Sequence, residues 1–314
     1  MLVHMQIYVA GHEGLVGRAI TRAVDARPDL DWIGASHKEL DLLDGPATLA
    51  FLEQNLPDVI IIAAAKVGGI SANDRFPVEF LLENLTIQNN LMKAAHQVGT
   101  KSLVFLGSAC IYPKFCEQPI KEEFLLTGTL EPTNEAYAIA KIAGLKLIQS
   151  YRREYGHSWI SVMPTNLYGP DDNFDLETSH VLPAMIAKCH KAKMDSASFV
   201  ELWGTGTPRR EFLHVDDLAD ALLLLATSYD DPSHINIGCG VDIELSDLAA
   251  LIAKIVGFSG DVVWNTQMPD GTHEKRLDIS KLSALGWEPK IELADGIRSV
   301  YESYLESQNK HLNA

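Results

Sequence analysis

Residue types that exchange protons stand at two places in the sequence where their spacing favours joint action. Ser108 and Cys110 lie two residues apart, directly after the apolar run 102–106. Tyr137 and Lys141 are four residues apart, so they share one face of the helix that this segment predicts. Hydroxyl, thiol, phenol and ammonium groups can act as acids or bases when their surroundings adjust their proton affinity. The sequence therefore indicates acid–base chemistry, provided that the fold brings both places together.

A third motif lies near the N-terminus and is typical of anion binding. The apolar run 6–10 is followed by Gly11, Gly14 and Gly17 in a G-x-x-G-x-x-G pattern, and then by an amphipathic segment. Glycines let the backbone approach a pyrophosphate closely, and the free N–H groups of a helix N-terminus hold it. A strand before the glycines and a helix after them predict a dinucleotide site.

The choice between the two nicotinamide cofactors depends on the end of the second strand. An acid there suits the ribose hydroxyl of NAD, and a basic residue suits the extra phosphate of NADP. The segment 35–39 contains His37 and Lys38, which favour NADP, whereas Glu13 in the glycine loop disfavours it. Both cofactors stay open at this point.

The elements that must position these residues alternate along the first half of the chain. Short apolar runs predict strands at 6–10, 31–35, 59–63, 103–106 and 160–164, and longer periodic segments predict helices near 15–26, 45–54, 78–98 and 135–155. Such alternation predicts an α/β fold with a doubly wound, mainly parallel, Rossmann-like sheet. Ligands bind beyond the carboxyl ends of such strands, which is where Ser108 stands.

The alternation weakens after residue 168, which indicates a second, smaller α/β region. We expect a dinucleotide-binding domain at 5–168 that the chain re-enters at about 213–238, and a substrate-binding domain at 169–212 and 239–314. The segment 213–217 is typical of a strand end followed by a helix cap, and the segment 234–238 predicts another strand.

Composition excludes several classes of protein. The 314 residues carry a formal net charge of −16, which disfavours sequence-independent binding to nucleic acid or to an anionic membrane. The four cysteines show no metal-binding spacing, so we expect no metal site and reduced thiols. No apolar run is long enough to span a membrane and no signal peptide is visible, so we expect a cytoplasmic protein.

The helix that carries Tyr137 begins after a proline, with Thr133 or Asn134 expected as its N-cap. An adjacent ammonium and the positive end of a helix both favour a phenolate. We therefore expect Lys141 to lower the pKa of Tyr137 and to fit the phenol for protonating a ketone oxygen during reduction.

Taken together, the glycine loop, the strand-end serine and the Tyr-x-x-x-Lys helix resemble the extended short-chain dehydrogenase/reductase superfamily. Longer blocks narrow the resemblance to the GDP-L-fucose synthases. These blocks span both predicted domains: 63–70 (AAAKVGGI), 108–113 (SACIYP), 130–134 (LEPTN), 163–170 (MPTNLYGP), 179–181 (SHV) and 210–213 (REFL).

The resemblance implies an activity and a set of catalytic residues. This family epimerises C3 and C5 of GDP-4-keto-6-deoxy-D-mannose and then reduces C4 with NADPH, which gives GDP-L-fucose. It implies Ser108, Tyr137 and Lys141 for reduction, Cys110 as the epimerisation base and His180 as the acid. We further expect strand alternation to aim Ser108 and Cys110 at the same sugar.

The resemblance also implies binding residues. For the cofactor these are Gly11, His12, Glu13, Gly14, Leu15, Val16, Gly17, His37, Ala64, Leu106, Gly107, Lys141, Pro164, Asn166, Leu167 and His180. For the GDP-sugar they are Lys188, Trp203, Arg210, Asp270 and Lys275, of which Arg210 and Lys275 would meet the phosphates. A tryptophan such as Trp203 is also typical of a hydrophobic core, so this alternative stays open.

Four positions depart from the family pattern. Glu13 and His37 stand where bacterial members carry arginines for the extra phosphate of NADP, so NADP is expected and NAD(H) stays open. Lys188 stands where arginine is common, which removes a bidentate contact. Ala109 replaces a serine beside Cys110 without explanation from the sequence.

Two alternatives remain beside the fucose assignment. A GDP-L-colitose synthase would act on a 3-deoxy ketosugar and epimerise only C5. A catalytically silent NAD(P)-sensing protein would keep the glycine loop without turnover. The resemblance also implies a homodimer formed by the helices at 78–98 and 135–155.

Overall fold

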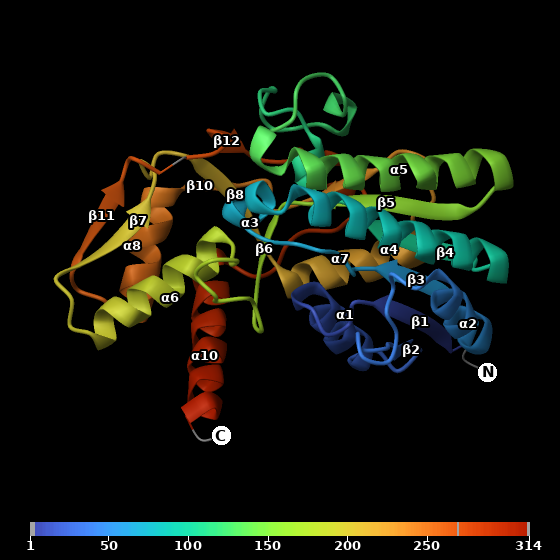
Figure 1. The fold of residues 1–314 in the computed structure, drawn as a ribbon, viewed down its shortest axis with the longest axis horizontal. Coiled ribbons are helices and arrows are strands. Elements are labelled where there is room, and N and C mark those ends of the chain that lie inside the picture. Colours follow the sequence, from blue (N-terminus) through green and yellow to red (C-terminus); the bar gives the residue numbers. More distant parts are fainter. Residues whose placement is uncertain (1–3, 269, 313–314) are drawn as a thin grey trace.

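Six parallel strands form the main sheet of the computed structural model, which describes residues 4–268 and 270–312 (Figure 1). Their order is β2-β1-β3-β4-β5-β9, and every neighbouring pair is parallel. The strands are β1 (Met5–Ala10), β2 (Leu30–Ile33), β3 (Val59–Ile62), β4 (Ser102–Leu106), β5 (Ser158–Pro164) and β9 (Ile235–Ile237). Because the chain runs from β1 to β2 on one side and then to β3 on the other, the switch point lies between β1 and β3.

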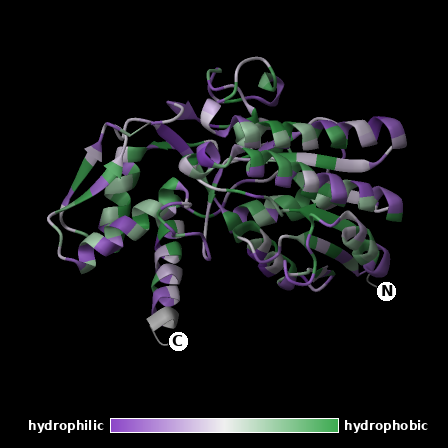
Figure 2. Ribbon diagram, viewed as in Figure 1, coloured by the Kyte–Doolittle hydropathy of each residue, from purple (hydrophilic) through white to green (hydrophobic). Residues whose placement is uncertain are grey.

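Helices cover both faces of this sheet. The alternation of side chains along β1 sends Ile7 and Val9 into one buried cluster and Tyr8 and Ala10 into another. The first cluster packs against α1 (Leu15–Asp25) and α7 (Val215–Ser228), and the second against α2 (Gly45–Asn55), α4 (Pro77–Val98) and α5 (Glu135–Tyr155). Green strands between the helices in Figure 2 mark this doubly covered core. The predicted α/β fold with a mainly parallel sheet is confirmed.

Outside the main sheet and its covering helices, the described residues form two small sheets, three longer helices and several short ones. Strand β8 (Arg209–His214) pairs with β6 (Asn166–Tyr168), β10 (Asp242–Glu244) and β12 (Glu274–Lys275). Strand β7 (Phe199–Trp203) pairs with β11 (Asp261–Asn265). A separate apolar cluster holds α6 (Val181–Met194), α8 (Leu245–Val256) and α10 (Leu293–Leu312) together. The short helices are α3 (Ile70–Arg75), α9 (Ser280–Ser283), η1 (Ala109–Ile111), η2 (Glu122–Phe124) and η3 (Pro132–Asn134).

The order of the elements along the chain differs from their grouping in space. Helix α7 and strand β9 lie with the main sheet, although they follow β7 and β8 in the chain. The domain boundaries, with the expected return of the chain at about 213–238, stay a prediction.

A buried carboxylate joins β8 of the four-stranded sheet to two neighbouring segments. Glu211 on β8 has no exposed surface, and it accepts hydrogen bonds from the N–H of Gly240 at 2.6 Å and of Leu277 at 2.9 Å. Burial raises its pKa, and these two bonds oppose that shift. Glu211 therefore fixes the segment after β12 against β8.

Among the described residues, no helix combines the length and the apolar composition that crossing a membrane requires.

Candidate active site

The glycine loop between β1 and α1 is shaped for close approach by an anionic group. Gly11 has φ of +87°, and a Cβ there would lie 2.7 Å from the backbone nitrogen of Ala64 at the end of β3. A Cβ on Gly17 would lie 2.1 Å from the carbonyl oxygen of Gly11. The N-cap is Gly14, which has no side-chain oxygen for the first-turn amides of α1. These amides stay available for a pyrophosphate, so the loop fits a dinucleotide.

The other predicted cofactor residues lie mostly at the same edge of the sheet. Ala64 follows β3, Leu106 ends β4, and Pro164 ends β5, with Gly107 and Leu167 close behind these strand ends. Asn166 differs, because its Nδ2 donates to the carbonyl oxygen of Glu211 at 2.8 Å, and this bond ties Asn166 to β8. The contact of each residue with the cofactor stays a prediction.

Near the end of β2, Glu39 contributes a charge that the sequence analysis did not single out. Its carboxylate accepts hydrogen bonds from both the N–H and the hydroxyl of Ser36 at 2.8 Å. The backbone bond from Ser36, followed by the hydroxyl bond, holds the pKa of Glu39 below its usual value. His37 and Lys38 are exposed on the same turn. The turn after β2 thus carries an acid beside the exposed cation Lys38.

Tyr137 and Lys141 lie on α5 as predicted, one turn apart. Lys141 is buried, with 3% of its surface exposed, and its Nζ donates to the carbonyl oxygen of Leu106 at 2.8 Å. The same Nζ lies 5.7 Å from the centroid of the Tyr137 ring. Lys141 therefore connects α5 to the end of β4, where Ser108 begins the next segment.

The expected effect of Lys141 on Tyr137 is wrong. Burial raises the pKa of Tyr137, the negative charge of Cys110 raises it further, and only the hydrogen bond with Ser108 lowers it. Burial also lowers the pKa of Lys141 to about 7. Desolvation outweighs the attraction that the sequence suggested, so the phenol stays protonated and is ready to donate to an oxygen of a ligand.

The segment after β4 places Ser108 and Cys110 side by side, but strand alternation is not the reason. Residues 109–111 form the 3-10 turn η1, and the N–H of Cys110 donates to the Ser108 hydroxyl at 3.2 Å. The turn therefore orients the pair, and our expectation of an extended segment is wrong. Ala109 is 3% exposed and packs in the cluster that contains Ile111 and Met163, so a small apolar residue suits this position.

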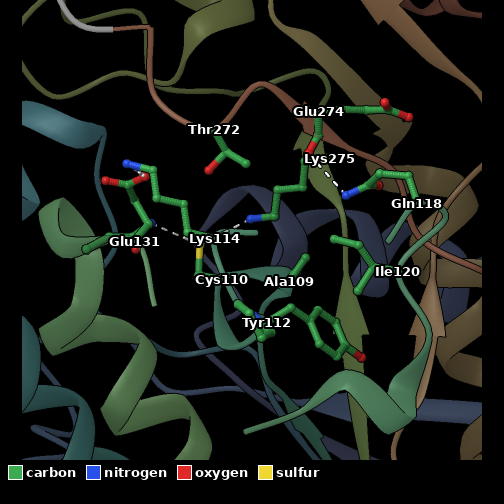
Figure 3. Close-up of a pocket in the computed structure, with 12 residues that line it drawn as sticks. Ala109, Cys110, Tyr112, Lys114, Gln118, Ile120, Glu131, Thr272, Glu274 and Lys275 are labelled. Carbon is green, nitrogen blue, oxygen red and sulfur yellow. Dashed lines mark hydrogen bonds and ion pairs between the residues drawn. The ribbon is translucent and has the colours of Figure 1, made fainter. Parts of the chain in front are cut away.

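Cys110 lines a small cavity of about 30 Å³ between the two regions (Figure 3). Its Sγ accepts a hydrogen bond from Asn134 Nδ2 at 3.3 Å, and the Nζ of Lys275 on β12 donates to it at 3.6 Å. Figure 3 shows the Lys275 side chain extending toward the sulfur. Asn134 does occupy the N-cap position of α5, yet its side chain makes no capping bond. The sequence predicted Asn134 only as a cap, and it predicted Lys275 as a phosphate contact.

His180 comes from the other region and stands at the N-cap of α6. Its loop is anchored to the segment after β3, because the N–H of Gly69 donates to the carbonyl oxygen of Thr178 at 3.1 Å. Part of His180 is exposed, but the protein atoms around its ring still lower its pKa by desolvation. A lower pKa makes the protonated imidazole a stronger acid.

The predicted substrate residues come from both small sheets and from α6, except Asp270, which lies between β11 and β12. Lys188 contacts the face of the Trp203 ring, with Nζ 5.4 Å from its centroid. Trp203 is 49% exposed, so it is not a core aromatic. Arg210 is largely buried, which lowers its pKa, and it donates to the carbonyl oxygen of Asp270 at 3.3 Å. The Asp270 carboxylate accepts from the N–H of Thr205 at 2.7 Å, so it fixes a turn beside Trp203.

Comparison with known proteins places this site in a family. The model of the NAD dependent epimerase/dehydratase family matches residues 7–238. The chain belongs to this family. GDP-L-fucose synthase 1 of Arabidopsis thaliana is 51% identical over 96% of this chain and 94% of that protein. GDP-L-colitose synthase of Yersinia pseudotuberculosis is 39% identical over 97% of this chain and 99% of that protein.

A solved structure shows the same fold with a cofactor. The GDP-L-fucose synthetase of Naegleria fowleri bound to NADP superposes with a TM-score of 0.89 at 30% identity, and the match covers 97% of this chain and 95% of that one. The predicted resemblance to GDP-L-fucose synthases is confirmed. This member of the epimerase/dehydratase family is an enzyme, and it uses a nicotinamide cofactor.

The pKa of Lys141 predicts how the stability of the cofactor-free enzyme depends on pH. A lysine whose pKa falls to about 7 on folding makes the unfolded chain the stronger proton binder above pH 7. Its contribution to stability is therefore least favourable below pH 7 and improves as the pH rises, by about 1.4 kcal/mol per pH unit. We expect the free energy of unfolding of wild type relative to Lys141→Met to increase from pH 7 to pH 9 in urea titrations.

Lys146→Met is the matched control, because Lys146 lies on the same helix and is exposed. Wild type and this variant should show the same dependence on pH. If Lys141→Met also runs parallel to wild type, the buried lysine does not carry the shift described above.

Proposed function

We propose that this enzyme epimerises C3 and C5 of GDP-4-keto-6-deoxy-D-mannose and reduces C4 to give GDP-L-fucose. The observation that carries the proposal is the hydrogen bonding of Ser108, just after β4, to both Cys110 and Tyr137, together with a glycine loop shaped for a dinucleotide. A relative that is 51% identical over 96% of this chain is named GDP-L-fucose synthase 1.

The residues fit each proton transfer. A C4 ketone makes the protons at C3 and C5 acidic, because their removal gives an enolate with its charge on the C4 oxygen. Cys110 as thiolate would take such a proton, and His180 would return one to the opposite face. Tyr137 and Ser108 would donate hydrogen bonds to the C4 oxygen throughout.

The same oxyanion site would serve the reduction. When bound, the nicotinamide supplies a hydride to C4. Tyr137 would then transfer its proton to the C4 alkoxide, and its raised pKa keeps that proton in place until the charge develops. Lys141, bonded to Leu106, would hold the end of β4 beside the phenol.

The two alternatives are weaker. The colitose synthase relative is 39% identical, well below the 51% of the fucose synthase relative. The silent-sensor alternative conflicts with the enzyme character of the family and with five intact catalytic positions. We therefore keep fucose formation as the proposed activity.

A labelling experiment tests the activity. Supplied with GDP-4-keto-6-deoxymannose and NADPH in heavy water, wild type should form GDP-L-fucose with deuterium at both C3 and C5, detected by NMR. Label at C5 alone would contradict the fucose assignment. Tyr137→Phe loses the donor to the C4 oxygen, so we expect both exchange and reduction to slow by at least about 100-fold.

Cofactor choice follows from the charges near β2. We propose that the enzyme uses NADPH and discriminates only weakly against NADH. Lys38 offers an exposed cation and His37 an exposed ring N–H donor to the extra phosphate, whereas the charged Glu39 suits a ribose hydroxyl and Glu13 repels a phosphate.

Glu13→Arg should therefore strengthen the preference for NADPH. We expect the ratio of kcat/KM for NADPH to that for NADH to rise about tenfold, which is ~1.4 kcal/mol, with a parallel fall in the Kd of NADPH. Glu53→Arg makes the same charge change at an exposed position of α2 and serves as control. An unchanged ratio would show that residue 13 does not face the phosphate.

Helices α4 and α5 also support a homodimer, which we propose as the working assembly. The two helices pack against each other, and the outer surface at their N-terminal ends exposes Val78, Leu82 and Ile139, which are 71%, 60% and 44% exposed. Leu82→Glu should convert dimer to monomer in light scattering after size exclusion. Met194→Glu alters an exposed apolar residue at the far end of α6 and should leave the mass unchanged.

A further inference from the structure

The sulfur of Cys110 is contacted by two nitrogen donors that come from different parts of the chain. Asn134 Nδ2 lies 3.3 Å away, at the start of α5, and Lys275 Nζ lies 3.6 Å away, on β12. A neutral thiol gains little from such donors, because its sulfur is a weak acceptor. A thiolate gains much more, because both bonds become charge-assisted and one donor carries a full positive charge.

Lys275 is held in this position on both sides. Gln118 Nε2 donates to the carbonyl oxygen of Glu274 at 3.2 Å, and its Oε1 accepts from the N–H of Arg276 at 2.9 Å. The N–H of Ile120 donates to the carbonyl oxygen of Arg276 at 2.7 Å. Gln118 and Ile120 belong to the loop that follows Cys110, so this loop and β12 form one unit around the sulfur.

Asn134 is positioned by a turn rather than by a helix cap. Its N–H donates to the carbonyl oxygen of Glu131 at 3.2 Å, and its side chain makes no hydrogen bond to the first-turn amides of α5. Its Oδ1 is buried without a hydrogen-bond partner. A cap of this residue type normally contributes stability through its side-chain oxygen. Here the amide contacts the sulfur instead, which indicates a role in the site.

The other charged and titratable groups around the cavity do not replace Lys275. Lys114 and Glu131 neutralise each other in an ion pair of 2.9 Å. Glu274 lies 3.9 Å from the Arg276 guanidinium, and Tyr137 keeps its proton because burial raises its pKa. Within the described part of the chain, Lys275 is the cation that bonds to the sulfur.

We propose that Lys275 and Asn134 are positioning residues that hold Cys110 as the thiolate needed for epimerisation. This inference rests on the proposed function of Cys110 as the base, and it assigns Lys275 to the sulfur in place of the phosphates. The thiolate takes the proton from the sugar carbon, the C–H electron pair moves into the enolate, and Cys110 becomes a neutral thiol. The donors then hold the sulfur until the proton returns to solvent.

Alkylation of Cys110 by iodoacetamide tests this without substrate or cofactor, because only the thiolate reacts. The rate is measured from pH 5 to pH 10, with modification of Cys110 followed by peptide mass spectrometry. For Lys275→Gln we expect the midpoint of the pH profile to rise by about one unit and the rate at pH 7 to fall about tenfold. Asn134→Ala should move the midpoint in the same direction by less.

Lys275→Arg keeps the charge and should recover most of the wild-type profile. Lys121→Gln removes an exposed cation from the same loop and should have no effect on the profile. Because Asn134 and Lys275 lie on separate segments, a shift in both variants cannot come from one local loss of structure. An unchanged profile in Lys275→Gln together with a higher KM for the GDP-sugar would overturn the inference and return Lys275 to the phosphates.

Exchange of label at C3 and C5 separates this inference from the proposed function. We expect exchange by Lys275→Gln to be slow at pH 7 and to approach the wild-type rate at high pH, where the thiolate forms without help. If exchange stays equally slow at every pH while alkylation shifts, the lysine acts on the substrate as well and the positioning role alone is insufficient. If wild type exchanges no label at all, the proposed function fails whatever the alkylation profile shows.

Discussion

The parallel direction of all six strands in the main sheet is the constraint on which the site depends. Parallel strands end at one edge, so the segments that follow β1, β3, β4 and β5 must meet there. The approach of Gly11 to Ala64 shows how tightly two of these segments meet. Ser108 follows the neighbouring strand, and α5 brings Tyr137 and Lys141 across from the face of the sheet. The topology of the parallel sheet therefore places these acid–base groups at the same edge as the glycine loop.

This constraint explains why the fold was predictable from the sequence. The strands and helices of the first half lie within two residues of their expected bounds, because apolar runs and amphipathic periods mark buried elements directly. The glycine loop was predictable for a similar reason, because the spacing of its glycines reflects the tight turn that the backbone makes there. One expectation failed because its outcome depends on burial, namely that Lys141 lowers the pKa of Tyr137. The pKa of Tyr137 rises and that of Lys141 falls because neighbours that are distant in sequence remove water from both groups.

Contacts between distant segments were also beyond the sequence pattern. Cys110 and Lys275 lie 165 residues apart, and no periodicity links them. Asn134 resembles an ordinary helix cap, and only the three-dimensional structure shows its amide on the sulfur. The turn at 109–111 was missed because a short run such as Ser-Ala-Cys-Ile fits an extended strand exit equally well. The family resemblance named the candidate catalytic residues but did not say which groups support them.

Glu211 shows how the two regions can share one site despite their separate cores. A buried carboxylate is costly unless hydrogen bonds satisfy it, and here its bonds come from Gly240 and Leu277, on two segments that must stay together. Leu277 stands two residues after Lys275, so the position of that lysine depends on the buried carboxylate. The same strand, β8, carries Arg210, whose guanidinium is already desolvated and directed by carbonyl oxygens. In a chain of net charge −16, cations with fixed positions are the means by which an anionic sugar nucleotide can be held. Arg210 and Lys275, the cations proposed for the sugar nucleotide and for the Cys110 sulfur, therefore belong to paired strands of one small sheet.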